Sequence, residues 1–581
     1  MSKNFTENRR RKKWSKTSGC DVSQRPAADI CRIGCDYRNS QPHWRINLLV
    51  LISATLASLT FTQVTTAESA KVPRPDRHWS GFANGGQWQT GLSVNHNAYP
   101  KVLWSQEVKE GRSQVVADES RVYVFGGGVV DSNSRPRRLN SWISGIDKVD
   151  GKTLWEFNLP SIMLEGQETF SGAKPCPRAT PLIHNGRLFA VTFTGQLICL
   201  SAREGQLNWK IDLVADRGAF PVQFGFTSSL VVDPQHKDRI CVLAAGESSG
   251  FYCLSVADGK VLWKADCKTA SYATPVLANF GRTPQWVVVT ADEVMGLSAS
   301  DGQLLWKHPM PEPGLTNVPT PLIVNDERMI VSGQGWKGTA AIKVTQANGR
   351  WTTDTLWKTD KLQYFYTNWI RLTDRVGLGC TDKYMAAFDL ETGELLGRWR
   401  GFSDGNVVAC NDGRYFVLGG HGKLSVLKFS DVNNSPKLTV LNQFQLIKRR
   451  CWTPISTSSN TLFARHDDKL ICFAFGTDQS DALQPLAGGA RELPMSEPPV
   501  AAANTSQDAV ELIFEIFETK GPDAAFRVYS ELRSDGKLSE KDRIAIIEAA
   551  RQVNQNEISD LILQHAMADF PDSVRIRALK K

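Results

Sequence analysis

A short turn that ends in a tryptophan recurs along this chain and constrains its fold more than any other feature. The first copy is DGKTLW (Asp150–Trp155), followed by EGQLNW ending at Trp209, DGKVLW at Trp263, DGQLLW at Trp306 and TGELLG at Gly397. In each copy the glycine lies four residues before the last position. A period of roughly 40 to 55 residues between such copies is typical of a repeat architecture. We therefore expect a fold built from repeated units.

Each unit has the pattern of four short antiparallel strands. The clearest example starts with a short strand near Ala179. An apolar strand (Leu188–Phe193) and a second one (Leu197–Leu200) follow, and then a Glu-Gly turn leads to a strand that carries Trp209. Short apolar strands separated by turn residues predict an antiparallel meander. Asp-Gly and Glu-Gly turns suit tight hairpins because glycine adopts positive φ at little cost.

The repeated glycines and tryptophans are predicted to be structural. An indole offers a large apolar surface, and its recurrence at one place in each repeat suits a wedge between sheets. The residues expected to dock the units are Trp104, Trp155, Trp209, Trp263, Trp306 and Trp357, with Gly151, Gly205, Gly259, Gly302 and Gly393.

Eight such units fit between about residues 112 and 476. Thr-Pro opens a first strand at Thr180, Thr274, Thr320 and Thr453, and weaker openings lie near Ser113, Thr227, Thr367 and Asn406. The last unit, from Cys451 to Phe475, has three strands, and the strand around Trp104 can supply the fourth. Closing a ring in this way avoids long free sheet edges. The sequence therefore predicts an all-β, eight-bladed β-propeller over residues 98–476.

The repeat resembles that of the PQQ-like propellers, a family with quinoprotein alcohol dehydrogenase-like and BamB-like members, here of the secreted bacterial type. Its motif, Ala-x-Asp-x-x-Thr-Gly-Lys-x-x-Trp, is matched best by Asp147, Gly151, Lys152 and Trp155, and by Asp389, Thr392, Gly393 and Glu394. The resemblance implies that each tryptophan docks one blade on the next. Gly397 departs from it, with Trp399 as the candidate replacement. The fifth unit is stretched before Trp357, and the seventh, near Phe444, lacks the motif.

The N-terminal part has the pattern of a secretion signal. Residues 1–45 hold 11 Lys or Arg against 4 Asp or Glu, and an apolar stretch from Ile46 to about Phe61 precedes Thr65-Thr66-Ala67. A basic start, a short apolar middle and small residues are typical of an export signal. We assign residues 1–67 to a leader and signal peptide and 68–97 to a lead-in segment, and we expect a periplasmic or cell-envelope protein. The alternatives are a retained membrane anchor over residues 46–64 and a disordered basic tail.

Charge and cysteine usage exclude some classes of function. The net charge of +8 comes mostly from the leader, so the folded part is nearly neutral and no nucleic-acid partner is expected. The sequence has no CxxC, CxxCH or adjacent cysteine pair, which gives no support to a zinc ribbon or an attached haem. Cys199, Cys253 and Cys472 take equivalent strand positions. We expect them to pack in the core rather than form disulfides or a redox centre.

The pattern changes after the propeller. Residues 477–505 are typical of a Pro/Ala-rich linker, and apolar residues then recur every three to four positions through 506–581, which predicts helices. Ser539 followed by Asp542 indicates a helix start close to a capping box. This tail resembles a short TPR-like array, and a small helical bundle is the alternative.

Polar side chains at the entry to the first strands predict a site on the propeller axis. Arginines and amides that converge on a channel could hold an anionic or carbonyl-rich ligand. The candidates are Arg112, Arg178, Tyr272, Asn317, Asn368, Asn406, Arg450 and Trp452. The alternative is that these groups satisfy one another and ordered waters. His308, His421 and His466 share no spacing, so no metal site is expected.

Two insertions on one propeller face predict a polar rim. They are Gly127 to Asn140, with Arg135, Arg137 and Arg138, and Pro160 to Arg178, with Glu165, Glu168 and Lys174. This rim is either an edge for a partner or ligand, or a pair of solvated loops.

The sequence favours an exported, non-catalytic propeller that acts as a scaffold for an envelope protein or an unknown ligand. No Gly-x-Ser-x-Gly, phosphate-binding loop or His-Glu-x-x-His motif is present. The alternative is a degenerate PQQ-dependent oxidoreductase. Resemblance to the family enzymes implies a pair of adjacent cysteines over the quinone and a calcium site, and neither motif can be placed here. We therefore expect no cofactor, and PQQ with calcium only under the alternative.

Overall fold

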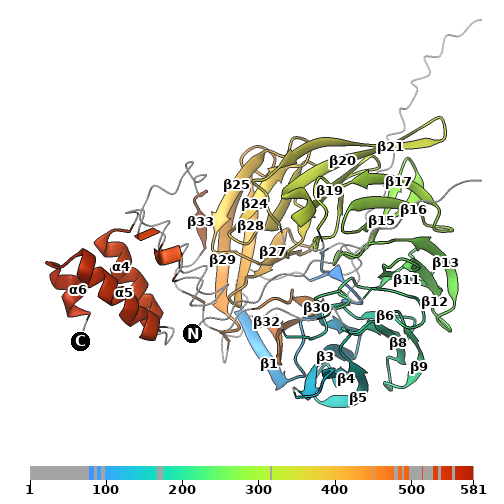
Figure 1. Cartoon of the computed structure of the whole chain (residues 1–581), viewed down its shortest axis with the longest axis horizontal. Coiled ribbons are helices and arrows are strands. Elements are labelled where there is room, and N and C mark those ends of the chain that lie inside the picture. Colours follow the sequence, from blue (N-terminus) through green and yellow to red (C-terminus); the bar gives the residue numbers. More distant parts are fainter. Residues whose placement is uncertain are drawn as a thin grey trace, which may run out of the picture. The chain divides into compact units, whose positions relative to one another are not determined.

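A computed structural model shows an eight-bladed β-propeller and a small group of C-terminal helices (Figure 1). The structure describes residues 78–83, 88–92, 99–131, 133–164, 167, 174–220, 222–314, 317–364, 366–448, 451–476, 482–483, 485–486, 490–495, 513, 526, 528–530, 532–533, 538–552 and 556–579. The predicted all-β, eight-bladed fold with a helical tail is confirmed. Contacts divide the chain into Met1–Lys71 and Val72–Lys581. The first unit, with the predicted signal and the whole of the possible anchor over residues 46–64, lies outside the described residues.

The first four blades are antiparallel sheets of four strands each, in sequence order. Blade 1 comprises β2 (Val116–Ala117), β3 (Arg121–Asp131), β4 (Arg138–Asp147) and β5 (Thr153–Ile162). Blade 2 comprises β6 (Leu182–His184), β7 (Arg187–Val191), β8 (Gln196–Ser201) and β9 (Leu207–Asp212). Blade 3 comprises β10 (Val231–Val232), β11 (Arg239–Ala244), β12 (Gly250–Ser255) and β13 (Val261–Asp266). Blade 4 comprises β14 (Val276–Phe280), β15 (Thr283–Val289), β16 (Glu293–Ser298) and β17 (Leu304–Pro309).

The next three blades continue this order. Blade 5 comprises β18 (Leu322–Ile323), β19 (Arg328–Gly333), β20 (Gly338–Ala347) and β21 (Arg350–Thr359), with a short 3-10 helix, η1 (Gln334–Trp336), before β20. Blade 6 comprises β22 (Trp369–Arg371), β23 (Val376–Cys380), β24 (Tyr384–Asp389) and β25 (Leu395–Arg400). Blade 7 comprises β26 (Asn406–Ala409), β27 (Arg414–Leu418), β28 (Lys423–Ser430) and β29 (Lys437–Gln445), and it gains a fifth strand, β33 (Arg491–Leu493).

Blade 8 closes the ring with strands from opposite ends of the propeller sequence. β30 (Ser456–Ser458), β31 (Thr461–His466) and β32 (Lys469–Gly476) come from its C-terminal part, and β1 (Tyr99–Glu107) supplies the outermost strand. Figure 1 shows β1 beside β32. The strand that carries Trp104 thus takes the place expected from the sequence.

In each of the eight blades, the strand at the position of the repeated tryptophan and its neighbour toward the axis share one irregularity. Their register shifts by one residue beside the position of the repeated tryptophan, as in blade 2, where Trp209 faces Cys199 before the shift. Such a bulge increases the local twist and redirects the strand. The residue that faces a tryptophan is small in every case, namely Gly145, Cys199, Cys253, Gly296, Ala341 or Cys472. A Cβ added to Gly145 would overlap the indole of Trp155. Small cysteines therefore suit these positions by size.

The hydrophobic core lies between neighbouring blades rather than at one centre. One cluster joins blades 2 and 3, another joins blades 3 and 4, and a third joins blades 4 and 5. All nine described cysteines are buried and unpaired. Each sheet therefore depends on the next for the burial of its apolar faces, which is how repeat structures build a continuous core.

Two segments outside the repeats pack onto the propeller. The described lead-in residues, 78–83 and 88–92, form backbone hydrogen bonds with the innermost strands β30, β2, β6 and β26. Within the segment interpreted as a linker, β33 pairs with β29, and Leu483 N–H donates to the carbonyl of Pro100 in β1. The outer edges of blades 7 and 8 are thus partly covered by residues that follow the last repeat.

The C-terminal helices in the described part of the chain include α4 (Glu540–Gln552), α5 (Asn556–Asp569) and α6 (Val574–Ala578). The start of α4 has the expected cap, because Ser539 N–H donates to the Asp542 carboxylate at 2.7 Å and the Asp542 N–H donates back to Ser539 Oγ at 3.3 Å. A resemblance to TPR arrays stays a prediction. None of the helices among the described residues is long and apolar enough to span a membrane.

Candidate functional site

An axial cavity of about 500 Å³ lies where the chain enters the innermost strands. Its lining residues are Phe82, Trp88, Arg112, Gln114, Arg178, Thr180, Phe224, Thr227, Ser229, Tyr272, Thr274, Val318, Tyr366, Asn368, Asn406, Trp452 and Pro454. Most of them precede, or begin, the first strand of a blade. They converge because every blade of a propeller begins at the axis.

The structure brings six of the eight predicted channel residues together at this cavity. They are Arg112, Arg178, Tyr272, Asn368, Asn406 and Trp452. That these side chains bind a ligand remains a prediction. The predicted Arg450 lies outside the described residues.

Asn317 takes a different place. Its amide N–H groups donate to the carbonyls of Thr290 at 3.1 Å and Gly314 at 2.8 Å, and its Oδ1 accepts from Gly335 N–H at 3.1 Å. The residue is fully buried. These bonds fix the link between blades 4 and 5, so its neighbour Val318 rather than Asn317 lines the cavity.

A belt of hydrogen bonds joins the innermost strands around the axis. From blade 5 to blade 7, Thr320 N–H donates to Asn368 Oδ1 at 2.8 Å, and Asn368 N–H donates to Asn406 Oδ1 at 3.4 Å. In blades 2 and 3, Thr180 N–H donates to Ser229 Oγ at 2.9 Å. The carbonyl oxygens of both cavity amides are therefore engaged in joining blades, which fits the alternative that these groups satisfy one another.

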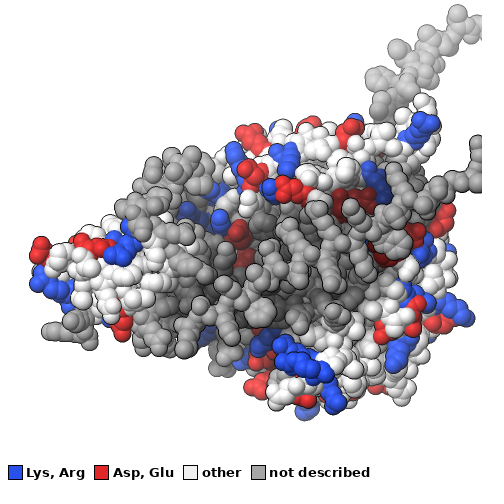
Figure 2. Space-filling model, in the orientation of Figure 1, with Lys and Arg blue, Asp and Glu red and all other residues white. Residues whose placement is uncertain are grey.

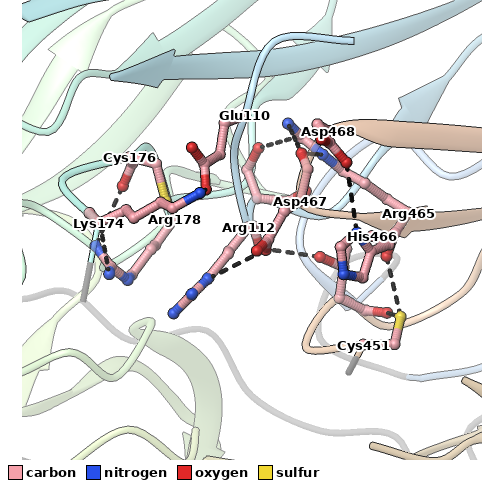
Figure 3. A network of polar contacts seen from close by, with 12 residues as sticks. Glu110, Arg112, Lys174, Cys176, Arg178, Cys451, Arg465, His466, Asp467 and Asp468 are labelled. Atoms are coloured by element: carbon pink, nitrogen blue, oxygen red, sulfur yellow. Dashed lines mark hydrogen bonds and ion pairs between the residues drawn. The ribbon is translucent and has the colours of Figure 1, made fainter. Parts of the chain in front are cut away.

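The arginines at the cavity belong to a network between blades 8, 1 and 2 (Figure 3). Arg178 donates to the carbonyls of Cys176, Phe224 and Lys174 at 3.1 to 3.2 Å. Burial lowers the pKa of its guanidinium from the usual value. Arg112 pairs with Asp467 at 3.3 Å. Both guanidiniums are therefore held in place before any ligand arrives.

Sequence reasoning missed Arg465, a central member of this network. Its side chain is fully buried in blade 8 and donates to the carbonyls of Phe125 at 2.7 Å and Lys109 at 2.8 Å. Burial lowers its pKa to about 10. The signal in the sequence was a single arginine at the end of the apolar strand TLFAR, which is too short a pattern to distinguish from an exposed residue.

The described lead-in residues bond to the innermost strands of four consecutive blades, at the ends opposite to those that enter the cavity, a role that the sequence did not predict. Trp79 N–H donates to Thr457 O in blade 8 at 3.0 Å, and Trp79 O accepts from Ala117 N–H in blade 1 at 2.9 Å. Further along, Trp88 O accepts from Ala409 N–H in blade 7 at 2.9 Å. Because Trp88 also lines the cavity, the lead-in forms part of its floor, and we infer that access is from the other face.

The first predicted insertion is an extended hairpin rather than a loop. β3 continues to Asp131, and β4 begins at Arg138. β5, which pairs with β4, is about as long. Arg135, Arg137 and Arg138 are exposed near its tip. In the second insertion, Lys174 pairs with Glu110 at 2.8 Å, while Glu165 and Glu168 lie outside the described residues.

The described surface carries both signs of charge. Figure 2 shows Lys and Arg interspersed with Asp and Glu on the face it presents. The described residues contain no group of three or more His, Cys, Asp or Glu side chains that could hold a metal ion. His308, one of the three histidines considered, instead lies between Thr353 and Thr355 at 3.0 Å from each hydroxyl.

Comparison with known proteins gives a family match over part of the chain. Residues 139–396 match a family model described as outer membrane protein assembly factor BamB. Among curated proteins, the outer membrane protein assembly factor BamB of Yersinia pestis is 22% identical over 234 residues, which cover 39% of this chain and 53% of that protein. The chain therefore spans about half the length of the curated relative it matches.

Solved structures give matches with low TM-scores. BamB from Moraxella catarrhalis is 15% identical, with a TM-score of 0.42, over 65% of this chain and 98% of that one. The quinohemoprotein alcohol dehydrogenase from Comamonas testosteroni is 11% identical, with a TM-score of 0.35, over 77% of this chain and 86% of that one.

Proposed function

We propose that this chain, a β-propeller of the PQQ-like repeat family, is a non-catalytic scaffold of the cell envelope that binds another protein. The curated relative is named as an outer membrane protein assembly factor, and the basic and apolar leader is the pattern of an exported protein. The helical tail is a second candidate contact surface.

One observation carries the proposal, namely the chemistry of the axial cavity. General acid–base catalysis needs a side chain that exchanges a proton near the working pH. Among the described lining residues there is no Asp, Glu, His or Cys. Burial raises the pKa of Tyr272 above the usual value, so its phenol stays protonated. The lining can therefore bind and orient a group but has no evident means of transferring its protons.

The extended β3–β4 hairpin is the proposed protein-contacting element. It projects from the face on which the cavity is proposed to open, and its tip exposes Arg135, Arg137 and Arg138. Exposed arginines at the tip of a hairpin suit recognition of carboxylates on a partner, because a guanidinium can donate two parallel hydrogen bonds to one carboxylate.

Affinity capture from an envelope extract tests the scaffold. We expect the purified chain to retain a defined envelope protein, and Arg137→Glu with Arg138→Glu to reduce its recovery at least about tenfold, because charge reversal repels an acidic partner. Lys260→Glu is the matched control, since it reverses an exposed charge in a turn on the opposite face. A chain without residues 506–581 shows whether the tail contributes. Equal recovery with the hairpin variant and the control would remove the hairpin from the proposal.

The alternative function, a PQQ-dependent oxidoreductase with calcium, fits this cavity poorly. Calcium prefers six to eight oxygen ligands that usually include carboxylates. The described lining offers amide and hydroxyl oxygens and two arginines but no carboxylate. The sequence also lacks the adjacent cysteines that the family resemblance implies for the enzymes.

Addition of PQQ and calcium to the purified chain separates the two functions. The scaffold hypothesis expects no quinone absorbance retained after gel filtration and no reduction of an electron-acceptor dye with a primary alcohol. Saturable retention of the quinone together with dye reduction would instead establish an oxidoreductase.

A further inference from the structure

The walls of the axial cavity differ in chemistry around the ring. The side formed by blades 1 and 2 presents the guanidiniums of Arg112 and Arg178. Aromatic rings cover much of the remainder, in two edge-to-face pairs. Phe224 and Tyr272 lie 5.8 Å apart between ring centroids, and Tyr366 and Trp452 lie 5.9 Å apart. A ligand that fits this cavity needs one polar end and one apolar body.

Both guanidiniums are fixed by aromatic contacts. The Cζ atom of Arg112 lies 5.6 Å from the ring centroid of Trp452, and that of Arg178 lies 5.6 Å from the ring centroid of Phe224. Stacking on a ring holds the planar guanidinium in one orientation. Less side-chain freedom is then lost when a ligand binds, so the cavity is preorganised for an anion.

The positive charge at this wall is only partly neutralised. Arg178 donates its hydrogen bonds to three backbone carbonyls, and no described carboxylate forms an ion pair with it. Arg112 has one carboxylate partner, Asp467. Burial is the main cause that lowers the pKa of Arg178, and the nearby charge of Arg112 lowers it further. An anion placed between the two guanidiniums would remove this repulsion.

The charge that suits this wall is a single negative one. Two guanidiniums face the cavity and one carboxylate already pairs with Arg112, so a monoanion restores neutrality where a phosphate with two charges would exceed it. A carboxylate also matches the fork of a guanidinium. The cavity of about 500 Å³ leaves room for an apolar group of side-chain size beside the carboxylate.

We propose that the axial cavity binds a carboxylate joined to an aromatic or apolar body, with the carboxylate at Arg112 and Arg178 and the body against the rings of Tyr272, Tyr366 and Trp452. The proposal rests on the scaffold function and extends it, since a free acid or the carboxyl end of a partner's polypeptide would present the same group. Binding needs no covalent step.

A matched pair of probes tests the charge requirement without any variant. N-acetylphenylalanine carries the carboxylate, and N-acetylphenylalaninamide has nearly the same shape and no charge. Titration into the full chain, followed by calorimetry and by saturation-transfer NMR, should show at least tenfold tighter binding of the acid. Equal affinities for the two probes, or no binding of either at millimolar concentration, would overturn the proposal.

Variants locate the binding site. Arg178→Gln should bring the affinities for acid and amide within about twofold of each other, whereas Arg138→Gln, which changes an exposed arginine on the β3–β4 hairpin, should keep the difference. A circular dichroism melt of each variant verifies folding. An Arg178→Gln protein that is folded and still prefers the acid tenfold would contradict the assigned position.

Peptide probes distinguish the two sources of the carboxylate. A hexapeptide that ends in phenylalanine with a free carboxyl group, compared with its amidated form, should show the same preference if the ligand is the end of a polypeptide. Preference for the free acid without binding of the peptide would assign the cavity to a small molecule. Because partner capture is measured separately, failure of the probes with successful capture removes this inference and leaves the scaffold function standing.

Discussion

The indole of Trp155 lies against Gly205 in the turn of the next blade, where any added side chain would overlap it. The same contact recurs between Trp104 and Gly151, and between three further tryptophans and the glycines of the following turns. In three of these five contacts the indole N–H also donates to a backbone carbonyl of the next blade: Trp104 to Lys148 at 2.9 Å, Trp209 to Val256 at 3.2 Å and Trp357 to Leu390 at 3.4 Å. The glycine of each turn thus serves both its own hairpin and the tryptophan of the blade before it.

Substitution of Gly205 tests this contact against a matched glycine. Gly205 and Gly186 both have positive φ, 72° and 70°, but a Cβ on Gly186 meets nothing within 4 Å. We expect Gly186→Ala to lower the free energy of unfolding by about 1 kcal/mol through backbone strain, and Gly205→Ala by about 3 kcal/mol because the indole must also move. Urea unfolding followed by tryptophan fluorescence measures both. Equal losses would mean that the indole contact contributes little.

Residue-level prediction succeeded where one periodicity governs the position. The entry to each first strand recurs with the repeat, so the sequence could place Arg178 and Asn406 at the axis. Arg465 was missed because its burial depends on carbonyls from blade 1, which no local pattern reveals. Asn317 was predicted to face the channel, but it does not line the cavity. Its side-chain amide is instead hydrogen-bonded within the link between blades 4 and 5.

At the scale of elements, the stretched fifth unit contains a long hairpin, β20–β21, that packs against blade 4. His308 in β17 lies between Thr353 and Thr355 of β21 and stacks on Trp336 with ring centroids 5.7 Å apart. Trp306 correspondingly donates to Gln285 within its own blade at 2.6 Å, rather than to a turn of the next one. An extended strand pair here takes over the docking that the glycine turn performs elsewhere.

The stability of this junction should depend on pH. Burial lowers the pKa of His308 below its ordinary value of 6.5, although Asp354 acts in the opposite direction. The unfolded chain therefore binds more protons at this position, and its contribution to stability falls as the pH drops below 6.5. We expect the melting temperature to decrease between pH 7 and pH 5, and His308→Gln to weaken that decrease.

The exposed His421 supplies the control for this prediction. His421→Gln should retain the pH dependence of the unmodified chain in the same differential scanning measurement. A pH dependence that survives in His308→Gln and disappears in His421→Gln would place the titrating group elsewhere.

Elements without a repeat were the hardest to predict. The lead-in and β33 have no second copy, and their pairing is with strands far away in the sequence, as between Thr439 and Glu492. Composition placed β33 in a Pro/Ala-rich linker, since a strand of three residues in such a stretch has no local signature. Their positions are set by the free edges that the ring leaves available.

For the whole molecule, the strand β1 determines whether the ring is closed. Trp104 packs on Phe463 in its own blade, at 6.2 Å between ring centroids, and on Gly151 of blade 1. It therefore joins the last blade to the first. The sequence could predict this closure because the last unit had only three strands, and the strand around Trp104 belonged to no other unit.

Removal of the Trp104 side chain should destabilise the propeller as a unit. We expect Trp104→Ala to lower the free energy of unfolding by about 3 kcal/mol, since a large side chain between two sheets is lost. Leu103→Ala is the control in the same strand, because Leu103 is 48% exposed and its loss should change stability by less than about 1 kcal/mol. A comparable effect of the two substitutions, measured by urea unfolding, would argue against closure through Trp104.

Ring closure by β1 also fixes an order of events during synthesis. β1 is synthesised before every other strand of the propeller. Its partner β32 leaves the ribosome only after residue 469 has been translated. Until then, β1 and the lead-in have no native neighbour in the eighth blade and remain open to pairing with other chains. Such a distant contact must also overcome the entropy of a very long loop. The newborn chain is therefore most vulnerable to aggregation before its last blade emerges, and a factor that shields its first strand would be most useful in that interval.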